Sequence, residues 1–232
     1  MQDAQDVKMR IDTAGANSVI VYFSGSSTLA LNRSVMSFYH ALTARQYPWF
    51  ESAVPSYDSV LVTYDWLQVD HRLVRQLLLQ LSVSDVDDNS SCHHVMKVWY
   101  GAKGANDLEL IAQQTQLSEA EIIDIHCRQT YRVFTVGFMP GFAYLGETPK
   151  RLAVPRMASP RLKVPKGAVA IADRQTAIYP DVSPGGWHLM GLCPTKLIDE
   201  KSRLSLLTAG DTVAFVPISE EEYREESRAH VE

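Results

Sequence analysis

The sequence predicts a small α+β domain followed by a mainly-β domain built as a barrel or a sandwich. Three observations predict this arrangement. Strand-like and helical patterns alternate through residues 7–81, a polar linker follows, and short strand-like runs dominate from residue 132 onward. Eight of the 11 prolines and seven of the 12 glycines fall within residues 137–195, which supplies the frequent turns that many short strands need.

The first domain is expected to be a sheet covered on one face by two helices. Residues 7–11, 18–23 and 59–64 have strand-like patterns, and the second of them is rich in β-branched and aromatic residues. Apolar residues recur at helical spacing between Leu31 and Leu42, and leucines four residues apart predict a second helix at 71–81. These apolar stripes are interpreted as core rather than as a binding surface.

A polar and acidic stretch at residues 82–91 is typical of a linker, so we place the two domains at 1–88 and 92–232. Cys92, His93 and His94 follow the linker and could be mistaken for a metal site. Adjacent ligands do not easily share one tetrahedral centre, and no second Cys/His cluster is spaced to complete it, so we expect no metal in this chain. The three cysteines lie far apart, which is typical of reduced thiols.

The second domain is expected to begin with a strand at 95–100 and two short helices at 108–116 and 119–127. Ser118 and Glu121 have the spacing of a capping box at the start of the second helix. The terminal residues 219–230 form either a strongly charged helix or a frayed tail. Further strands are predicted, in order, at 132–137, 161–164, 168–172, 176–179, 187–192 and 211–217.

Composition excludes several classes of protein. With 232 residues, 46% hydrophobic and 21% charged, the chain has enough apolar residues for a substantial core. Its net charge of −5 argues against a general nucleic-acid binder. No run approaches the 18 or so apolar residues of a membrane span. The first residues are acidic where a signal peptide is basic and then apolar, so we expect a cytoplasmic protein.

Positive charge gathers in residues 137–195, which carry seven Lys/Arg against three Asp/Glu. Arg156 and Arg161 each follow a proline, and proline stiffens a segment so that less entropy is lost when the guanidinium meets a ligand. The planar guanidinium of arginine can donate two parallel hydrogen bonds to a phosphate or a carboxylate. The composition therefore favours an anionic ligand on fixed loops, although a loop-rich barrel wall with solvated arginines explains it equally well.

Common catalytic motifs are absent from the sequence. There is no GxxxxGK[ST] phosphate loop, no GxGxxG, no HExxH and no GxSxG. The histidines show no recognisable triad spacing with a cysteine or carboxylate. These absences favour a subunit that completes an active site together with a partner.

Long motifs resemble a known family. They are GFMPGFAYLG at 137–146, the series PR…PR…VPKGAVAIA at 155–172, QTAIYP at 175–180 and SPGGWHLMG at 183–191. They resemble the family that contains the B subunit of bacterial ATP-dependent 5-oxoprolinase and the inhibitor of a sporulation histidine kinase, a family also labelled allophanate hydrolase subunit 1. The likeness is strong over 95–217, whereas 1–90 is similar in arrangement more than in motif.

The resemblance implies a cyclophilin-like β-barrel for the second domain and a heteromeric complex with a C subunit and an A subunit. It also implies hydrolysis of 5-oxo-L-proline to L-glutamate, with ATP as co-substrate and Mg²⁺ shared with the partners. The alternative is a regulatory protein that binds and inhibits a sensor histidine kinase. Prolyl isomerase activity is suggested only by the name of the barrel, and a fold does not imply a function.

Phosphoryl transfer to a lactam oxygen needs fixed positive charge and hydrogen-bond donors. The candidate catalytic residues are therefore Arg156, Arg161 and Lys163, with His126 either a general base or merely a structural histidine near a helix end. The candidates for binding substrate or partner are Phe138, Pro140, Gly141, Tyr144, Lys166, Gln175, Tyr179, Pro184, Gly185, Gly186 and Trp187.

Four positions depart from the family pattern and bear on the choice of substrate. Asp173 and Ala177 stand where the family usually has glycine. His188 stands where it usually has glutamine, and Leu192 lies in a segment that usually carries an arginine and a threonine. If those glycines hold a positive φ, aspartate tolerates that conformation better than alanine does.

Overall fold

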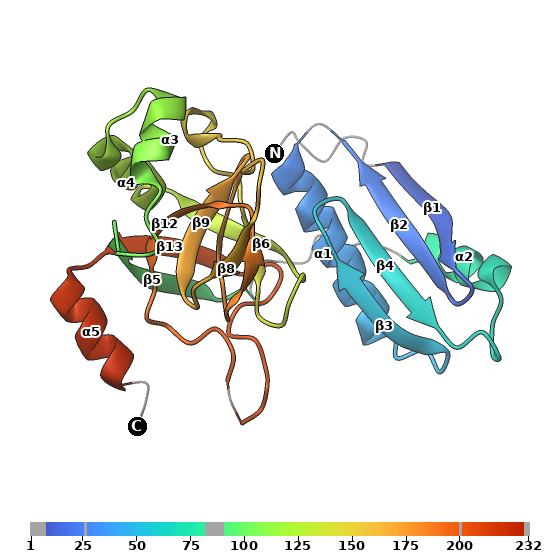
Figure 1. Ribbon diagram of the computed structural model, residues 1–232. Helices are drawn as coiled ribbons and strands as arrows, with labels where there is room; N and C mark the ends of the chain where they lie inside the picture. The colour runs from blue at the N-terminus through green and yellow to red at the C-terminus, as the bar shows by residue number, and fades with distance from the viewer. Residues whose placement is uncertain (1–7, 26, 82–90, 200, 230–232) are drawn as a thin grey trace. The chain divides into compact units, whose positions relative to one another are not determined.

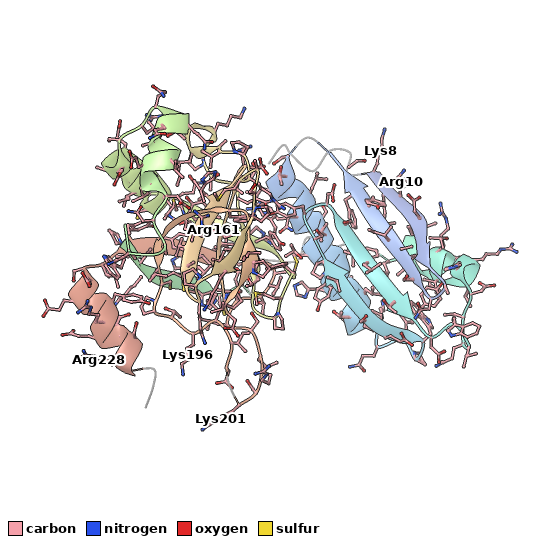
Figure 2. The ribbon with its side chains drawn as sticks, in the orientation of Figure 1. Lys8, Arg10, Arg161, Lys196, Lys201 and Arg228 are labelled. Atoms are coloured by element: carbon pink, nitrogen blue, oxygen red, sulfur yellow. The ribbon has the colours of Figure 1, made fainter. Side chains whose placement is uncertain are left out.

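The computed structural model describes residues 8–25, 27–81, 91–199 and 201–229 of the chain, and the chain divides into two compact units, 1–91 and 92–232 (Figure 1). Figure 2 adds the side chains to the same ribbon. Within the described ranges, no helix is long and apolar enough to cross a membrane.

The first unit is a four-stranded antiparallel sheet in the order β1-β2-β4-β3. Alternation along β2 buries Val19, Val21 and Phe23, and these residues share one hydrophobic cluster with Phe38 of α1 and Val74 of α2. Both helices therefore cover the same face of the sheet, as predicted. The elements are β1 (Lys8–Gly15), β2 (Ser18–Ser24), α1 (Thr28–Ala44), β3 (Phe50–Pro55), β4 (Ser59–Tyr64) and α2 (His71–Leu79).

Strand β3 was not predicted. It lies at the edge of the sheet and pairs only with β4, and three of its residues, Glu51, Ser52 and Val54, are exposed. A half-solvated edge strand needs no clean apolar alternation, and Pro55 at its end weakens the strand signal further. The sequence pattern is therefore weak at this strand.

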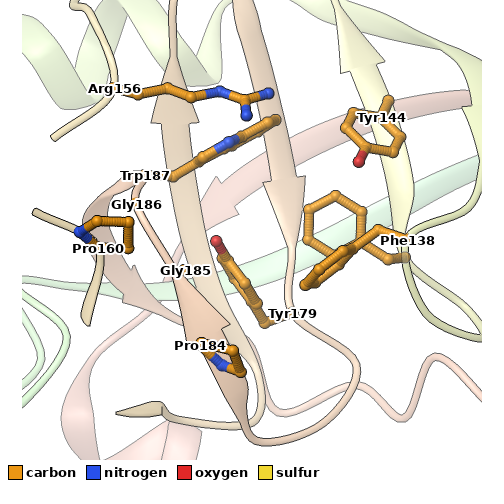
Figure 3. A pocket seen from close by; sticks show the side chains of 10 residues that line it. Phe138, Tyr144, Arg156, Pro160, Tyr179, Pro184, Gly185, Gly186 and Trp187 are labelled. Carbon is orange, nitrogen blue, oxygen red and sulfur yellow. The ribbon is translucent and has the colours of Figure 1, made fainter. Parts of the chain in front are cut away.

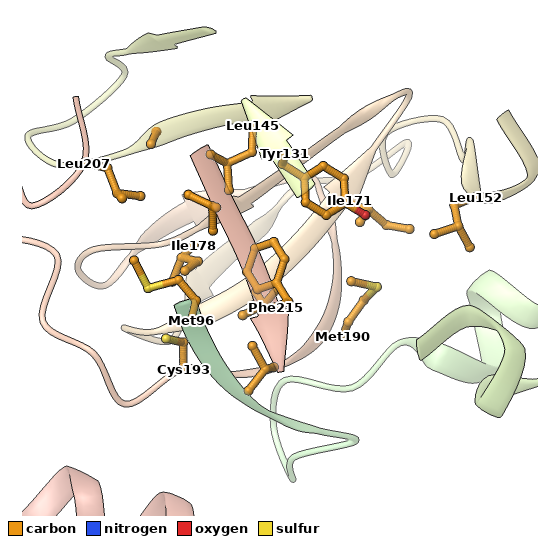
Figure 4. Packing of buried hydrophobic residues seen from close by; sticks show 14 of the residues in the cluster. Met96, Tyr131, Leu145, Leu152, Ile171, Ile178, Met190, Cys193, Leu207 and Phe215 are labelled. Carbon is orange, nitrogen blue, oxygen red and sulfur yellow. The ribbon is translucent and has the colours of Figure 1, made fainter. Parts of the chain in front are cut away.

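The second unit is a closed seven-stranded barrel in the order β10-β7-β6-β13-β5-β12-β9, which confirms the predicted mainly-β barrel. Pairing is antiparallel except between β5 and β13, which run parallel. Its interior is filled by a cluster that includes Met96, Tyr131, Met190 and Phe215 (Figure 4). The strands are β5 (His93–Tyr100), β6 (Thr130–Val136), β7 (Ala143–Gly146), β9 (Ala168–Ala172), β10 (Gln175–Ile178), β12 (His188–Leu192) and β13 (Thr212–Pro217).

Strand β9 is buried on both faces and separates two cores. Val169 and Ile171 belong to the barrel interior, whereas the alternate alanines at 168, 170 and 172 belong to a second cluster with Phe142, Tyr179 and Trp187. The small alanines let large rings pack against the outer face of the strand. A two-stranded sheet of β8 (Arg161–Val164) and β11 (Ser183–Gly185) contributes Val164 to this outer cluster.

The helices of the second unit agree with the prediction. The capping box at α4 is present, because the Glu121 amide donates to Ser118 Oγ at 3.3 Å and the Ser118 amide donates to Glu121 Oε2 at 2.9 Å. The charged C-terminal segment is a helix rather than a tail. The helices are α3 (Leu108–Thr115), α4 (Glu119–Cys127), the 3₁₀ turn η2 (Lys150–Leu152) and α5 (Glu220–Ala229).

Candidate functional site

A cavity of about 220 Å³ lies over the outer core of the barrel domain (Figure 3). Its volume is below the roughly 300–1,000 Å³ of sites for drug-sized ligands, so it suits a small molecule. Three of its walls, Phe142, Tyr179 and Trp187, are themselves members of that outer core, which fixes them. The lining residues are Phe138, Phe142, Tyr144, Arg156, Pro160, Tyr179, Pro184, Gly185, Gly186 and Trp187.

The aromatic walls pack around Phe142. Its ring meets those of Tyr144, Tyr179 and Trp187 edge to face, with centroids 4.9, 5.1 and 5.8 Å apart. This geometry is favourable between aromatic rings and leaves them little freedom. Phe138 packs edge to face on Phe142 as well, at 5.4 Å, but is 63% exposed at the rim. The cavity therefore has a rigid apolar floor and an exposed aromatic rim.

Arg156 provides the positive charge of the cavity. Its guanidinium carbon lies 5.8 Å from the centre of the Trp187 ring, a cation–π contact that Figure 3 shows from the side. No carboxylate among the described residues forms an ion pair with Arg156, and no hydrogen bond joins its guanidinium to them. Its five N–H donors are therefore open to an anionic group.

Tyr179 provides a hydroxyl donor at the cavity. The residue is 2% exposed, and its hydroxyl forms no hydrogen bond within the described part of the chain. Burial raises the pKa of Tyr179, so the hydroxyl keeps its proton and can donate it. The ring rests against Gly185, where a Cβ atom would lie 2.3 Å from the hydroxyl oxygen. Glycine at 185 is therefore what allows Tyr179 to point into the cavity.

Arg161 has a different environment from Arg156. Its Nη2 lies 2.5 Å from Oδ1 of Asp107, and its Nη1 donates to the carbonyl oxygen of Trp187 at 3.3 Å. The second oxygen of Asp107 accepts from the Leu189 amide at 2.7 Å. Asp107 and Arg161 therefore join β8 to β12 and hold the backbone behind Trp187, and the charge of Arg161 is already neutralised.

The other predicted cations do not reach the cavity. Lys163 and Lys166 are both exposed, and neither lines it. Of the four cations considered in the sequence, the structure brings only Arg156 to the cavity. The positive charge at the cavity is thus the free guanidinium of Arg156, and Arg161 supports the wall behind Trp187.

His126 lies inside the barrel domain, is fully buried and does not line the cavity. Its Nδ1 accepts from the Tyr100 hydroxyl at 2.7 Å, and its Nε2 donates to Thr176 Oγ1 at 2.9 Å while that hydroxyl donates to the carbonyl of Ala170. Burial lowers the pKa of His126 from 6.5 to about 3, so the ring is neutral. Of the two roles considered for it, the geometry fits the structural one.

Seven of the residues proposed from the sequence for binding line the cavity, namely Phe138, Tyr144, Tyr179, Pro184, Gly185, Gly186 and Trp187. Pro140, Gly141, Lys166 and Gln175 do not. Gly141 serves the loop instead, because its φ is +77° and a Cβ there would meet Ile198 at 2.6 Å. Phe142 and Pro160 were missed, although Phe142 lies within the same Gly/Pro/aromatic run and Pro160 directly precedes Arg161.

The four positions that depart from the family pattern have different environments in the structure. Asp173 has a φ of +51° in the turn between β9 and β10, the conformation in which aspartate is better tolerated than alanine. Ala177 pairs with Ala170 in β10 and needs no positive φ. His188 is buried and donates from Nε2 to the carbonyl of Pro155 at 3.1 Å. Leu192 packs against the outer core.

Known proteins share both the sequence and the fold. Residues 9–207 match the family described as the carboxyltransferase domain, subdomain C and D. The chain belongs to this family. The B subunit of 5-oxoprolinase from Bacillus subtilis is 35% identical over 94% of this chain and 96% of its own length. The B subunit of the same enzyme from Haemophilus influenzae is 42% identical over 62% of this chain and 66% of its own length.

Solved structures show how the family is used in longer chains. The crystal structure of TTHA0988 has a TM-score of 0.77 and 31% identity, and the match covers 87% of this chain but 40% of that one. The Kluyveromyces lactis urea amidolyase has a TM-score of 0.79 at 16% identity, which shows the fold alone, and the match covers 97% of this chain and 16% of the amidolyase. The family fold therefore occurs both as a chain of this length and as one part of a much larger protein.

Proposed function

We propose that this chain is the B-type subunit of an ATP-dependent lactam hydrolase that converts 5-oxo-L-proline to L-glutamate. The names of its relatives support this proposal. The observation that carries it is the combination of an unpaired guanidinium at Arg156, an unpaired hydroxyl at Tyr179 and fixed aromatic walls around one small cavity. Each of these groups matches a part of the proposed substrate.

The substrate has a carboxylate and a small, flat lactam ring. Arg156 would bind the carboxylate through its fork, because charge-assisted and bidentate pairs of this kind are strong and directional. The walls formed by Phe142 and Trp187 would bury the ring. The Tyr179 hydroxyl would donate to the lactam oxygen and so fix the orientation of the ring.

The cavity fits the small acid better than a nucleotide. Its lining carries one cation and no carboxylate, whereas Mg²⁺ bound to phosphates is usually held by one or two carboxylates. The sequence also lacks a phosphate-binding loop. We therefore assign ATP and Mg²⁺ to the partner C and A subunits, which would phosphorylate the lactam oxygen and make the ring carbon a better electrophile.

The same lining explains why a partner is needed. It contains no histidine, cysteine or carboxylate that could activate water. His126 is enclosed by its own hydrogen bonds and does not line the cavity. This chain would thus bind and orient the lactam, and a partner subunit would supply the general base together with the phosphoryl donor.

The test is release of glutamate from 5-oxo-L-proline by the chain mixed with C and A subunits and ATP. Arg156→Ala should lower kcat/KM about 10- to 100-fold, since a hydrogen-bonded charge contributes about 1.5–3 kcal/mol, and most of the loss should appear in KM. Lys163→Ala is the matched control, because Lys163 is an exposed residue of β8 that does not line the cavity, and the variant should behave as wild type.

Two outcomes would count against the proposal. If the complete mixture releases no glutamate, the assigned reaction is wrong, and tight binding to a sensor histidine kinase would then support the regulatory alternative. If Arg156→Ala and Lys163→Ala have the same kinetics, the assigned reaction is not contradicted, but the cavity at Arg156 does not bind the substrate.

A further inference from the structure

A second group of ligand-type side chains lies where β5 and β13 begin. Cys92, His94 and Asp211 place a thiol sulfur, an imidazole nitrogen and a carboxylate oxygen within 4.8 Å of one another. Nε2 of His94 and Oδ2 of Asp211 are 3.3 Å apart. Two ligands bonded to one tetrahedral zinc ion at about 2.0–2.1 Å lie about 3.4 Å from each other, so this separation already suits a shared ion.

Strand geometry explains how the three side chains meet. Successive side chains of a strand point to opposite sides, so Cys92 and His94 share one side and His93 takes the other, where its Nδ1 lies 2.9 Å from Thr212 Oγ1. Strands β5 and β13 are parallel with Thr212 opposite His93, which places Asp211 beside Cys92. The expectation of no metal considered only neighbours in sequence, and Asp211 is 117 residues from His94.

Asp211 is held rigidly before any ion binds. Its Oδ1 accepts from the Cys92 amide at 2.9 Å, and its Oδ2 accepts from the amide and hydroxyl of Thr208 at 2.9 and 3.0 Å. The carboxylate is 5% exposed, and within the described residues no lysine or arginine pairs with it. A buried negative charge whose ion-pair partner is a histidine favours an added cation.

We propose that Cys92, His94 and Asp211 form a zinc-binding site with three protein ligands and a water molecule in the fourth position. Sulfur, nitrogen and oxygen donors together suit Zn²⁺. Cys92 is exposed and the His94 side chain is 18% exposed, so an ion can enter from solvent.

The ion would cross-link the start of β5 to the start of β13, the two parallel strands. None of the three ligands lines the cavity at Arg156, so the proposal is independent of the reaction assigned to the complex. The three ligands are brought together only by folding, so the ion binds the folded state and not the unfolded chain. Such binding stabilises the folded state. Zinc should therefore raise the unfolding temperature of the isolated chain.

The test uses the full chain, freed of metal and kept reduced, titrated with Zn²⁺ by calorimetry and with Co²⁺ by absorption spectroscopy. One ion should bind per chain, and Co²⁺ should give a thiolate-to-metal charge-transfer band. Cys92→Ser should lose that band, and His94→Gln should lose saturable binding of both metals. His93→Gln, on the other side of the strand, should bind as wild type.

Cys127→Ser is the matched thiol control. The serine hydroxyl retains a donor toward Tyr100, so this variant should fold and keep the band. Circular dichroism checks that each variant is folded. The proposal is overturned if the wild type shows no saturable zinc binding, or if folded Cys92→Ser and His94→Gln bind zinc as tightly as wild type.

Discussion

Two polar regions of the barrel domain, the network around His126 and the cavity at Arg156, contain similar groups and differ in how those groups are paired. At His126 both ring nitrogens, the Tyr100 hydroxyl and the Thr176 hydroxyl have partners. At the cavity, Arg156 and the Tyr179 hydroxyl have no hydrogen-bond partner in the described chain. One region is complete without a ligand and the other is not.

This difference shows what kind of observation indicates a binding site. The pKa of His126 is strongly lowered, yet burial alone causes the shift and the ring does not line the cavity. Perturbed pKa values occur at both functional and structural sites. Arg156 and the Tyr179 hydroxyl face one cavity and have no hydrogen-bond partner among the described residues, so both are open to a ligand. Tyr179 is therefore a stronger indication of a ligand than His126, whose ring nitrogens both have partners.

The largest expected effect concerns the wall behind the cavity. Arg161→Ala leaves the carboxylate of Asp107 buried without its ion pair, and breaking such a pair costs about 3 kcal/mol of unfolding free energy. Lys163→Ala, on the same strand but exposed, should change stability by less than about 0.5 kcal/mol. Urea unfolding measures both. Equal stability of the two variants would show that Asp107 and Arg161 do not support this wall.

A smaller effect is expected in the pH dependence of the unfolding free energy, which the network around His126 influences. The pKa of His126 is about 3 in the folded protein against an ordinary 6.5, so the unfolded chain binds a proton that the folded one does not. The associated stability is present above pH 6.5 and is lost toward pH 3, by about 2 kcal/mol at pH 5.

Urea unfolding at pH 7 and pH 5 measures this loss. His126→Gln should be less stable at pH 7 and should show a flatter dependence on pH, because the titrating ring is gone. A variant with the same slope as wild type would mean that other groups cause the acid sensitivity.

The smallest effect is expected from a substitution in the wall of the cavity at Arg156. Gly185→Ala places a Cβ atom 2.3 Å from the Tyr179 hydroxyl, so the ring must move, which costs about 1 kcal/mol and about tenfold in kcat/KM of the complex. Gly186→Ala is the matched control, since its Cβ would make an ordinary 3.5 Å contact with Pro160. Steady-state kinetics measures both variants. If they have the same kcat/KM, Tyr179 has no role in the reaction.

Much of the fold was predictable because it depends on local patterns. A strand was predicted at 168–172, and the structure shows that both of its faces are buried. β7 and β11 were missed because they are only three or four residues long and contain glycine or proline. Their pairing partners, not their own residues, make them strands.

The sequence by itself determined the family, the barrel and the segment that surrounds the cavity, because long motifs and apolar periodicity are local properties of the chain. Only the tertiary structure decided which arginine is free. Arg156 and Arg161 both follow a proline, and what separates them is Asp107, which lies 54 residues before Arg161 and neutralises it. Such a pairing depends on how distant strands meet, and no local pattern contains that information.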